Sequence, residues 1–498
     1  MKKYYLELIV FFAGALTMIF ELSGVRVMGP YFGTSIFVWT SLIGIILGSL
    51  SIGYWLGGLV SLKRADYIIL SWILLLASFF ILITAISNNY ILIRVVKYIP
   101  DFRLKIVVSS IVLFGPASVF LGMVLPYAVK LKIIDLQTSG STVGNFYALS
   151  TAGSIIGTFL AGFFLIPVYG FANILYFISA ILIVQSFLLF IRNKKLLQSA
   201  ITIFLALFLV FFWIRSSNKK HSYIDVDTQY NRVLIYNTTD INTGRPIKML
   251  NVNDERSSAM FTDKDDDLVF EVLKYYRLID HFNPGFKKSL MIGGSGYAFP
   301  KDYLRKYPEA TIDVVEIDPG LTELAKIHFN LPDDPMLSIY HEDGRTFLNR
   351  TDNKYDAVFM DAYKSMITIP YQLTTKEAVQ RIYEILNING VVFANLISSL
   401  DKKNNQFLRA ELATYQSVFP QVYLFAVQYP DPSEKEKEYF QNIMLVGLKS
   451  PAEPRFISAD AELNKYLQHR ITGEIQNDQE ILTDEYAPVE YYTSKVLK

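Results

Sequence analysis

The sequence predicts a chain of two parts, a multi-span α-helical membrane domain followed by an α/β domain that begins with a small β element. The chain has 498 residues, of which 52% are hydrophobic and 19% are charged, whereas soluble domains usually carry about 25% charged residues. Residues 1–220 contain 17 basic and 5 acidic residues, a net of +12, and residues 221–498 contain 30 and 41, a net of −11. Apolar stretches of about 20 residues, the length that crosses a bilayer, all lie before residue 220.

The composition also excludes several classes of function. The chain has no cysteine, which rules out disulfides, thiolate nucleophiles and cysteine-ligated metals. The five histidines are scattered singly, and none stands in an HxxxH or HExxH spacing, so no metal is expected. The acidic second half argues against a nucleic-acid partner, because phosphate binding needs basic patches.

Seven apolar segments are predicted to cross a membrane. They are residues 5–25, 36–62, 67–86, 104–131, 143–168, 171–191 and 199–214. A further apolar segment, residues 90–99, is too short to cross and is expected to be interfacial or re-entrant. Basic residues divide nine to eight between the two sides of these segments, so the positive-inside rule fixes no orientation.

The predicted domain boundaries follow this change of pattern. An integral membrane domain of about seven helices spans residues 1–215, a small β element spans 221–285, a nucleotide-binding α/β domain spans 286–450, and a C-terminal extension spans 451–498. In the β element, short β-type runs alternate with polar breaks, which predicts an antiparallel sheet. These runs are residues 232–236, 247–252 and 257–261.

From residue 288 onward, short apolar runs alternate with helical patterns, which predicts a doubly wound sheet. The expected strands are residues 289–292, 311–316, 337–341, 357–360 and 391–396. Helices are expected at 319–329 and at 374–386, the second with a capping signal formed by Thr374 and Glu377.

Glycines and acids stand where these strands are predicted to end, the edge at which doubly wound sheets bind ligands. They are Gly293, Gly294, Gly296, Glu316, Asp343 and Asp361. Glycines allow backbone to approach a ligand closely, and an acid 20 residues after the glycine loop can accept hydrogen bonds from ribose hydroxyls. Phe299 replaces the third glycine of G-x-G-x-x-G, and no Gly-Lys-Ser/Thr follows, which favours a nucleoside without a pyrophosphate, such as S-adenosylmethionine.

These motifs resemble the spermidine synthase (polyamine aminopropyltransferase) family. The resemblance is carried by residues 293–300, by Val-Glu-Ile-Asp-Pro at 315–319, by Glu-Asp-Gly-Arg-Thr-Phe-Leu at 342–348 and by Met-Asp-Ala at 360–362. Residues 21–24, 30–34 and 482–490 resemble the membrane-bound branch of the family, in which a multi-span domain precedes the synthase-like domain. The resemblance covers almost the entire chain and implies a Rossmann-like, methyltransferase-type fold.

The resemblance also implies roles for individual residues. Glu316 would hold the ribose hydroxyls, Asp343 would accept from the adenine amino group, and Asp361 would deprotonate and orient the attacking amine, which needs a base within hydrogen-bond reach. The other implied contacts are Gly293, Gly294, Gly296 and Asn231 to the nucleoside, and Tyr230 and Tyr363 to the amine. No cofactor is expected to be bound tightly. The co-substrate would be decarboxylated or intact S-adenosylmethionine, and no metal is needed because the sulfonium carbon is already electrophilic.

Two departures from the family's motifs leave alternatives open. Gly296 replaces an aspartate that meets the amine of the decarboxylated donor, and Lys364 replaces an aspartate three residues after Asp361. The leading hypothesis is a membrane-anchored aminopropyltransferase that makes a polyamine such as spermidine from putrescine and releases methylthioadenosine. Gly296 motivates a methyltransferase that uses intact S-adenosylmethionine, and Glu21 and Arg26 motivate a membrane carrier or sensor regulated by a nucleotide-binding domain.

The remaining expectations concern surroundings and partners. Asp263, Asp265, Asp266 and Asp267 either restore acidity near the site or form a solvated turn. The expected partners are a small amine and the lipid bilayer, and members of this family commonly form homo-oligomers. Because the nucleoside donor is cytosolic, the soluble part is expected in the cytoplasm and the chain in the cell membrane as a multi-pass protein.

Overall fold

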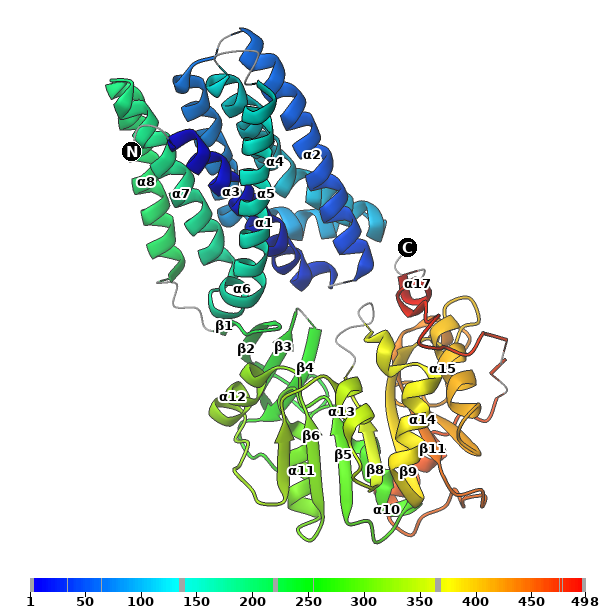
Figure 1. The fold of residues 1–498 in the computed structure, drawn as a ribbon. Helices are drawn as coiled ribbons and strands as arrows, with labels where there is room; N and C mark the ends of the chain where they lie inside the picture. The colour runs from blue at the N-terminus through cyan, green and yellow to red at the C-terminus, as the bar shows by residue number, and fades with distance from the viewer. Residues whose placement is uncertain are drawn as a thin grey trace. The chain divides into compact units, whose positions relative to one another are not determined.

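The computed structural model describes residues 4–33, 35–63, 65–133, 139–217, 223–253, 255–362, 369–473, 475–476 and 478–494. The chain forms two compact units, Met1–Ser222 and Tyr223–Lys498. Figure 1 traces both units from blue at the N-terminus to red at the C-terminus.

Unit 1 is helical, and seven helices among its described residues are long and apolar enough to cross a membrane. Their most apolar windows have mean hydropathies of 1.8 to 2.6. The elements are α1 (Tyr5–Phe32), α2 (Ile36–Lys63), α3 (Tyr67–Tyr98), α4 (Phe102–Lys132), α5 (Ser139–Leu160) with a π-helical turn (Ala161–Leu165) and α6 (Ile166–Val168), α7 (Phe171–Arg192) and α8 (Leu196–Ser217). Each of the seven predicted segments falls within one of these helical stretches.

The prediction of a separate short segment at residues 90–99 is wrong, because α3 continues without a break to Tyr98. The polar residue Asn88 precedes this segment and does not interrupt the helix. Its side-chain amide donates to the carbonyl oxygens of Thr84 and Ala85 in the same helix, at 3.0 and 2.9 Å. A polar side chain that bonds back to its own helix needs no water, so the apolar segment extends α3.

Small residues bring helices of unit 1 into backbone contact. A Cβ atom at Gly14 of α1 would lie 2.2 Å from the carbonyl oxygen of Ser150 in α5. A Cβ at Gly53 of α2 would lie equally close, 2.2 Å, to the carbonyl oxygen of Val119 in α4. Neither position has room for a side chain, which is the packing that small residues permit between apolar helices.

Unit 2 begins with a four-stranded antiparallel sheet in the order β1-β2-β3-β4. The strands are β1 (Tyr223–Asp227), β2 (Arg232–Thr239), β3 (Pro246–Val252) and β4 (Glu255–Phe261). The three predicted runs lie within β2, β3 and β4. The sequence analysis missed β1, which is short and mostly exposed and therefore shows little hydrophobic alternation.

The second sheet of unit 2 has seven strands in the order β10-β11-β9-β8-β5-β6-β7. They are β5 (Lys288–Ile292), β6 (Thr311–Val315), β7 (Leu337–Tyr340), β8 (Tyr355–Met360), β9 (Leu386–Ser398), β10 (Gln421–Ala426) and β11 (Gln441–Leu448). Strands β5 to β9 are parallel, and β11 runs antiparallel to both β9 and β10. The chain builds outward from β5 to β7 and then returns to β8 on the other side of β5. This reversal creates a topological switch point at the ends of β5 and β8.

Helices and short helical turns connect the strands of this sheet (Figure 1). They are α9 (Glu271–Lys274), η2 (Tyr275–Leu278), α10 (Ile279–Phe282), α11 (Ala298–Lys306), α12 (Pro319–His328), α13 (Gly344–Arg350), η3 (Tyr371–Leu373), α14 (Lys376–Ile385), α15 (Gln406–Gln416), η4 (Glu436–Glu438), α16 (Ala461–Gln468) and α17 (Val489–Ser494). Residues beyond 450 pack into the same core, since Leu463, Tyr466 and Leu482 are all buried there.

The start of α14 differs from the prediction. The N-cap residue is Thr375, whose hydroxyl accepts from the N–H of Ala378 at 3.4 Å. Thr374 instead donates to the carbonyl oxygen of Tyr371 at 2.8 Å, because the turn η3 precedes the helix and uses that hydroxyl. The predicted pairing of Thr374 with Glu377 as a capping box is therefore wrong.

Candidate active site

A cavity of about 610 Å³ lies at the switch point of the large sheet. Its walls include Gly293, Gly294 and Ser295 after β5, Asp361 after β8, and Asn395 of β9. The remaining wall comes mainly from β2, β3, β4 and the segment around α9. Small-molecule sites commonly enclose about 300–1,000 Å³, so this cavity is large enough for a nucleoside or an amine.

The glycine loop is held tightly against the end of β8. Gly293 has a φ of +96°, and a Cβ there would lie 2.4 Å from the carbonyl oxygen of Asp361. Ser295 and Tyr297 also adopt left-handed conformations, with φ values of 47° and 55°. Such backbone costs energy for residues other than glycine and persists only where the surroundings fix it. The buried Tyr297 hydroxyl provides one such anchor, at 2.7 Å from the hydroxyl of Thr322.

Glu316 fixes the same loop from the end of β6. Its Oε2 accepts from the N–H groups of Gly294 and Ser295, both at 2.9 Å, and its Oε1 accepts from the N–H of Asp318 at 2.9 Å. Burial raises the pKa of the Glu316 carboxyl, and these three backbone N–H groups oppose that rise. Glu316 is only 6% exposed and does not line the cavity among the described residues. Its carboxylate therefore orders the glycine loop.

Asp361 brings a carboxylate into the cavity. Its Oδ1 accepts from the side-chain amide of Asn395 at 2.9 Å, and its backbone N–H donates to Ile292 at 2.9 Å. The Tyr276 hydroxyl lies nearby and favours the charged carboxylate, although its geometry falls short of a full hydrogen bond. Burial raises the pKa of Asp361, and Asn395 and Tyr276 oppose the rise. A carboxylate with a raised pKa in a cavity is a candidate general base.

A chain of side-chain amides supports Asp361, and the sequence analysis missed it. The amide of Asn442 in β11 donates to Asn395 at 2.9 Å, and the amide of Gln428 donates to Asn442 at 2.9 Å. All three residues line the cavity. The available signal was an asparagine inside the apolar run of β9, where a polar side chain needs a partner.

The structure places the other predicted site residues differently. Asp343 caps α13 and accepts from the N–H of Thr346 at 3.0 Å. Asn231 is buried, and its amide donates to Asp318 at 2.7 Å, so it joins the β1–β2 turn to the start of α12. The adjacent Tyr230 is 37% exposed. Neither Asp343 nor Asn231 lines the cavity among the described residues.

Two positions of the predicted site, Tyr363 and Lys364, lie outside the described residues. Within the described part of the chain, no group of three His, Asp or Glu side chains is arranged to hold a metal ion.

Gly296 has no space for a side chain in this structure. A Cβ there would lie 2.6 Å from both the Cβ and the Oγ of Ser258 in β4. Ser258 is 2% exposed and is itself one of the residues that line the cavity. An aspartate at this position, as in the family motif, would therefore require Ser258 to move.

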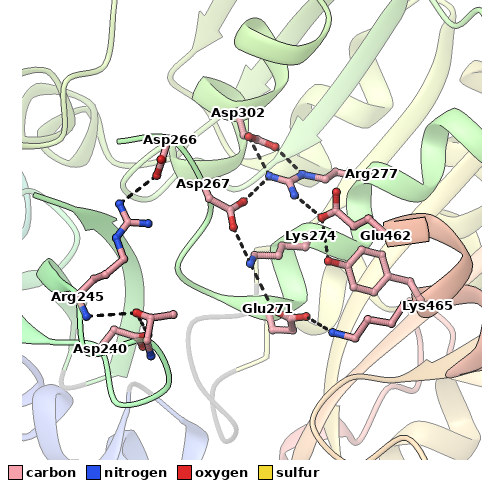
Figure 2. Close-up of polar contacts among 12 residues, drawn as sticks. Asp240, Arg245, Asp266, Asp267, Glu271, Lys274, Arg277, Asp302, Glu462 and Lys465 are labelled. Atoms are coloured by element: carbon pink, nitrogen blue, oxygen red, sulfur yellow. Dashed lines mark hydrogen bonds and ion pairs between the residues drawn. The ribbon is translucent and has the colours of Figure 1, made fainter. Parts of the chain in front are cut away.

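The acidic cluster at residues 263–267 does not supply acidity to the cavity. Figure 2 shows Asp267 bound to Arg277 and Lys274, with Asp302 and Glu462 also on Arg277. The rest of the cluster is paired too: Asp263 and Asp266 with Arg245, and Asp265 with Lys301. Although burial opposes it, hydrogen bonds from Lys274 and Arg277 lower the pKa of Asp267 to about 2. The cluster therefore forms structural ion pairs.

Comparison with known proteins places unit 2 in a family. A family model described as "Spermine/spermidine synthase domain" matches residues 271–443. The polyamine aminopropyltransferase of Vibrio vulnificus (strain CMCP6) is 28% identical over 205 residues, which cover 41% of this chain and 64% of the Vibrio protein. A probable polyamine aminopropyl transferase of Bifidobacterium longum (strain NCC 2705) is 31% identical over 219 residues, covering 41% of this chain and 48% of that protein.

A solved structure is also similar. The crystal structure of a probable spermidine synthase from Corynebacterium glutamicum ATCC 13032 has 24% sequence identity and a TM-score of 0.41, covering 48% of this chain and 83% of that chain. The chain spans about half to two thirds of the length of the two curated relatives.

The strand order, the glycine loop and the acids at the strand ends define unit 2 as a Rossmann-like domain of the methyltransferase type. With the matching family model and relatives, residues 271–443 of unit 2 belong to the spermidine synthase (polyamine aminopropyltransferase) family.

Proposed function

We propose that this protein is a membrane-anchored polyamine aminopropyltransferase. It would transfer an aminopropyl group from decarboxylated S-adenosylmethionine to putrescine or a similar amine. The observation that carries the proposal is the carboxylate of Asp361, which lines the cavity beside the glycine loop and is oriented by Asn395. The names of the relatives from Vibrio and Bifidobacterium support the same reaction class.

The reaction needs a neutral amine and an electrophilic carbon. The lone pair of the amine nitrogen attacks the methylene carbon bound to the sulfonium, so a C–N bond forms as the C–S bond breaks. The bonding electrons return to sulfur, and methylthioadenosine leaves as a neutral thioether. Asp361 accepts a proton from the attacking amine and later releases it to water, the task of a general base.

The proposed nucleoside contacts of Glu316 and Asp343 use carboxylate lone pairs that accept no hydrogen bond within the described part of the protein. Glu316 accepts two N–H groups on Oε2 and one on Oε1, which leaves a lone pair of Oε1 for a ribose hydroxyl. Asp343 accepts from its helix on Oδ1, which leaves Oδ2 for the adenine amino group. Asn231 would contact the nucleoside only if its side-chain amide left Asp318, since its backbone groups are bonded to Thr228. Tyr230 and Tyr363 would contact the amine.

The test is product analysis with the full-length chain in detergent. We expect putrescine and decarboxylated S-adenosylmethionine to yield spermidine and methylthioadenosine, identified by mass spectrometry. Asp361→Asn should lower turnover by about 10²–10⁴-fold while it binds methylthioadenosine normally. The exposed Asp352 lies outside the cavity, so Asp352→Asn serves as the control and should keep full turnover. Full turnover in Asp361→Asn would remove Asp361 from the mechanism.

One observation favours a second candidate, a methyltransferase that uses intact S-adenosylmethionine. Position 296 is a glycine, so no carboxylate there repels the carboxylate of the intact donor. The same product analysis separates the candidates, because methyl transfer releases S-adenosylhomocysteine and aminopropyl transfer releases methylthioadenosine.

The proposal also places unit 1 in the cell membrane, unit 2 in the cytoplasm and the N-terminus outside. The support is the set of seven apolar helices. Because the chain has no cysteine, single cysteines can report orientation through an impermeant maleimide. Tyr4→Cys should react in intact cells and Asp352→Cys only after permeabilisation, and the reverse pattern would refute this orientation. Native mass spectrometry of the same protein tests whether it forms a homo-oligomer.

A further inference from the structure

The cavity contains a single basic side chain among its described lining residues, that of Arg256 in β4. The acidic side chains of the lining are Asp240, Glu255, Glu271 and Asp361. A site for a diamine and a decarboxylated donor handles only cationic groups, and a cation in its wall repels them. The presence of Arg256 therefore needs an explanation in terms of the ligand.

Arg256 is exposed, and its side chain has no hydrogen-bond or ion-pair partner among the described residues. Eight of the other ten arginines of unit 2 pair with a carboxylate. The two others, Arg455 and Arg470, do not line the cavity. The acid Glu271 is already held by Lys274 and Lys465, at 3.6 and 3.4 Å. A guanidinium presents five N–H donors in a fork that fits a carboxylate. Arg256 thus offers the cavity an unused anion-binding group.

The position of Arg256 relative to the glycine loop is fixed. Its neighbour Ser257 joins β4 to the loop through a hydroxyl–hydroxyl hydrogen bond of 2.7 Å to Ser295. Ser258, the next residue, fills the space that an acid at position 296 would need. Compared with the family motif, the cavity wall next to the glycine loop therefore lacks the aspartate at position 296 and carries an unpaired arginine.

We propose that Arg256 is a specificity-determining residue that binds a carboxylate group of one of the two substrates. This inference rests on the proposed function, in which a nucleoside donor and an amine share the cavity. The carboxylate belongs either to an intact S-adenosylmethionine donor or to an amine that keeps its amino-acid carboxylate. In both cases the amine attacks the same methylene carbon, the C–S bond breaks and methylthioadenosine leaves. Only the transferred group or the acceptor differs.

The test compares pairs of compounds that differ by one carboxylate. Calorimetry on the full-length chain in detergent would measure S-adenosylmethionine against its decarboxylated form, and ornithine against putrescine with methylthioadenosine bound. We expect the wild type to prefer the carboxylated member of one pair. Arg256→Gln should weaken that member by about ten- to a hundredfold, as expected for loss of a charged hydrogen bond. Arg256→Lys should retain part of the preference.

The outcomes separate the inference from the function on which it rests. Methylthioadenosine binds without Arg256, so its affinity should stay within about twofold of wild type in Arg256→Gln. The exposed Lys402 lies outside the cavity, and Lys402→Gln is the charge-matched control. Failure of the wild type to bind methylthioadenosine would overturn the proposed function. Normal methylthioadenosine binding with no preference for a carboxylate, or with a preference that Arg256→Gln leaves intact, would overturn the inference alone.

One further result must be distinguished from these. If Arg256→Gln also weakens methylthioadenosine, hydrogen exchange of residues 289–299 would report damage to the glycine loop. Arg256→Lys then distinguishes loop damage from loss of the positive charge, because this variant keeps the charge. Loss of the carboxylate preference in an Arg256→Lys protein with an ordered loop and normal methylthioadenosine binding would also overturn the inference.

Discussion

Replacing Gly296 by alanine should strain the glycine loop, and the structure sets the size of the effect. The new Cβ would lie 2.6 Å from two atoms of Ser258, about 0.8 Å inside the shortest ordinary contact of 3.4 Å. Overpacking of this kind costs about 1–3 kcal/mol. The next atom, Cδ1 of Leu250, lies 3.8 Å away, which is an ordinary contact. The whole cost should therefore come from Ser258.

This reasoning is tested by a double-mutant cycle. Hydrogen exchange of residues 289–299, followed by mass spectrometry on the full-length chain, measures local opening of the loop. Gly296→Ala should speed exchange about 5- to 150-fold, the factor that corresponds to about 1–3 kcal/mol. Ser258→Gly removes both close atoms, so Gly296→Ala should have little further effect in that background. Equal effects of Gly296→Ala in both backgrounds would refute the role of Ser258.

Three other predictions follow from the contacts of unit 2. Asn395→Ala removes a hydrogen bond that lowers the pKa of Asp361, so this pKa should rise further. Because the proposed base must be deprotonated, kcat/KM should begin to fall at a higher pH than in wild type as the pH is lowered. An unchanged pH profile would contradict this coupling. Glu316→Gln should weaken methylthioadenosine binding and speed exchange of the glycine loop, since it removes the charge from the acceptor of three N–H groups; unchanged exchange would show that the loop is ordered without it. Arg277→Met leaves the buried Asp302 with one ion-pair partner fewer and should destabilise unit 2 by about 3–5 kcal/mol, measured as faster exchange of residues 271–282.

Much of the fold was predictable because its signals are local. Apolar length identified the seven helices, and short apolar runs followed by glycine or acid identified the strand ends, of which those of β5 and β8 line the cavity. The prediction failed where the outcome depends on a partner far along the chain. Asn395 is a polar residue in an apolar strand until β11 supplies Asn442, which is 47 residues away.

The same distinction applies to individual residues of the candidate site. Asn231 stands where the family's Tyr-Gln pair has glutamine, and the structure uses its amide on Asp318, at the start of α12. The close contact between Gly296 and Ser258 joins the loop after β5 to β4 of the other sheet, and neither sequence neighbourhood indicates it. A motif therefore located the cavity, whereas the partners of each side chain decided which residues face it.

The row of amides behind Asp361 has a consequence for how the protein responds to its surroundings. Carboxamides neither gain nor lose protons in the physiological range, so Gln428, Asn442 and Asn395 keep the same hydrogen bonds at acidic and alkaline pH. A support built from histidine or carboxylate would change its charge with pH and could reorient the base. Here the orientation of the Asp361 carboxylate, the proposed base, does not depend on the charge of its supports, and only the proton on Asp361 itself responds to pH.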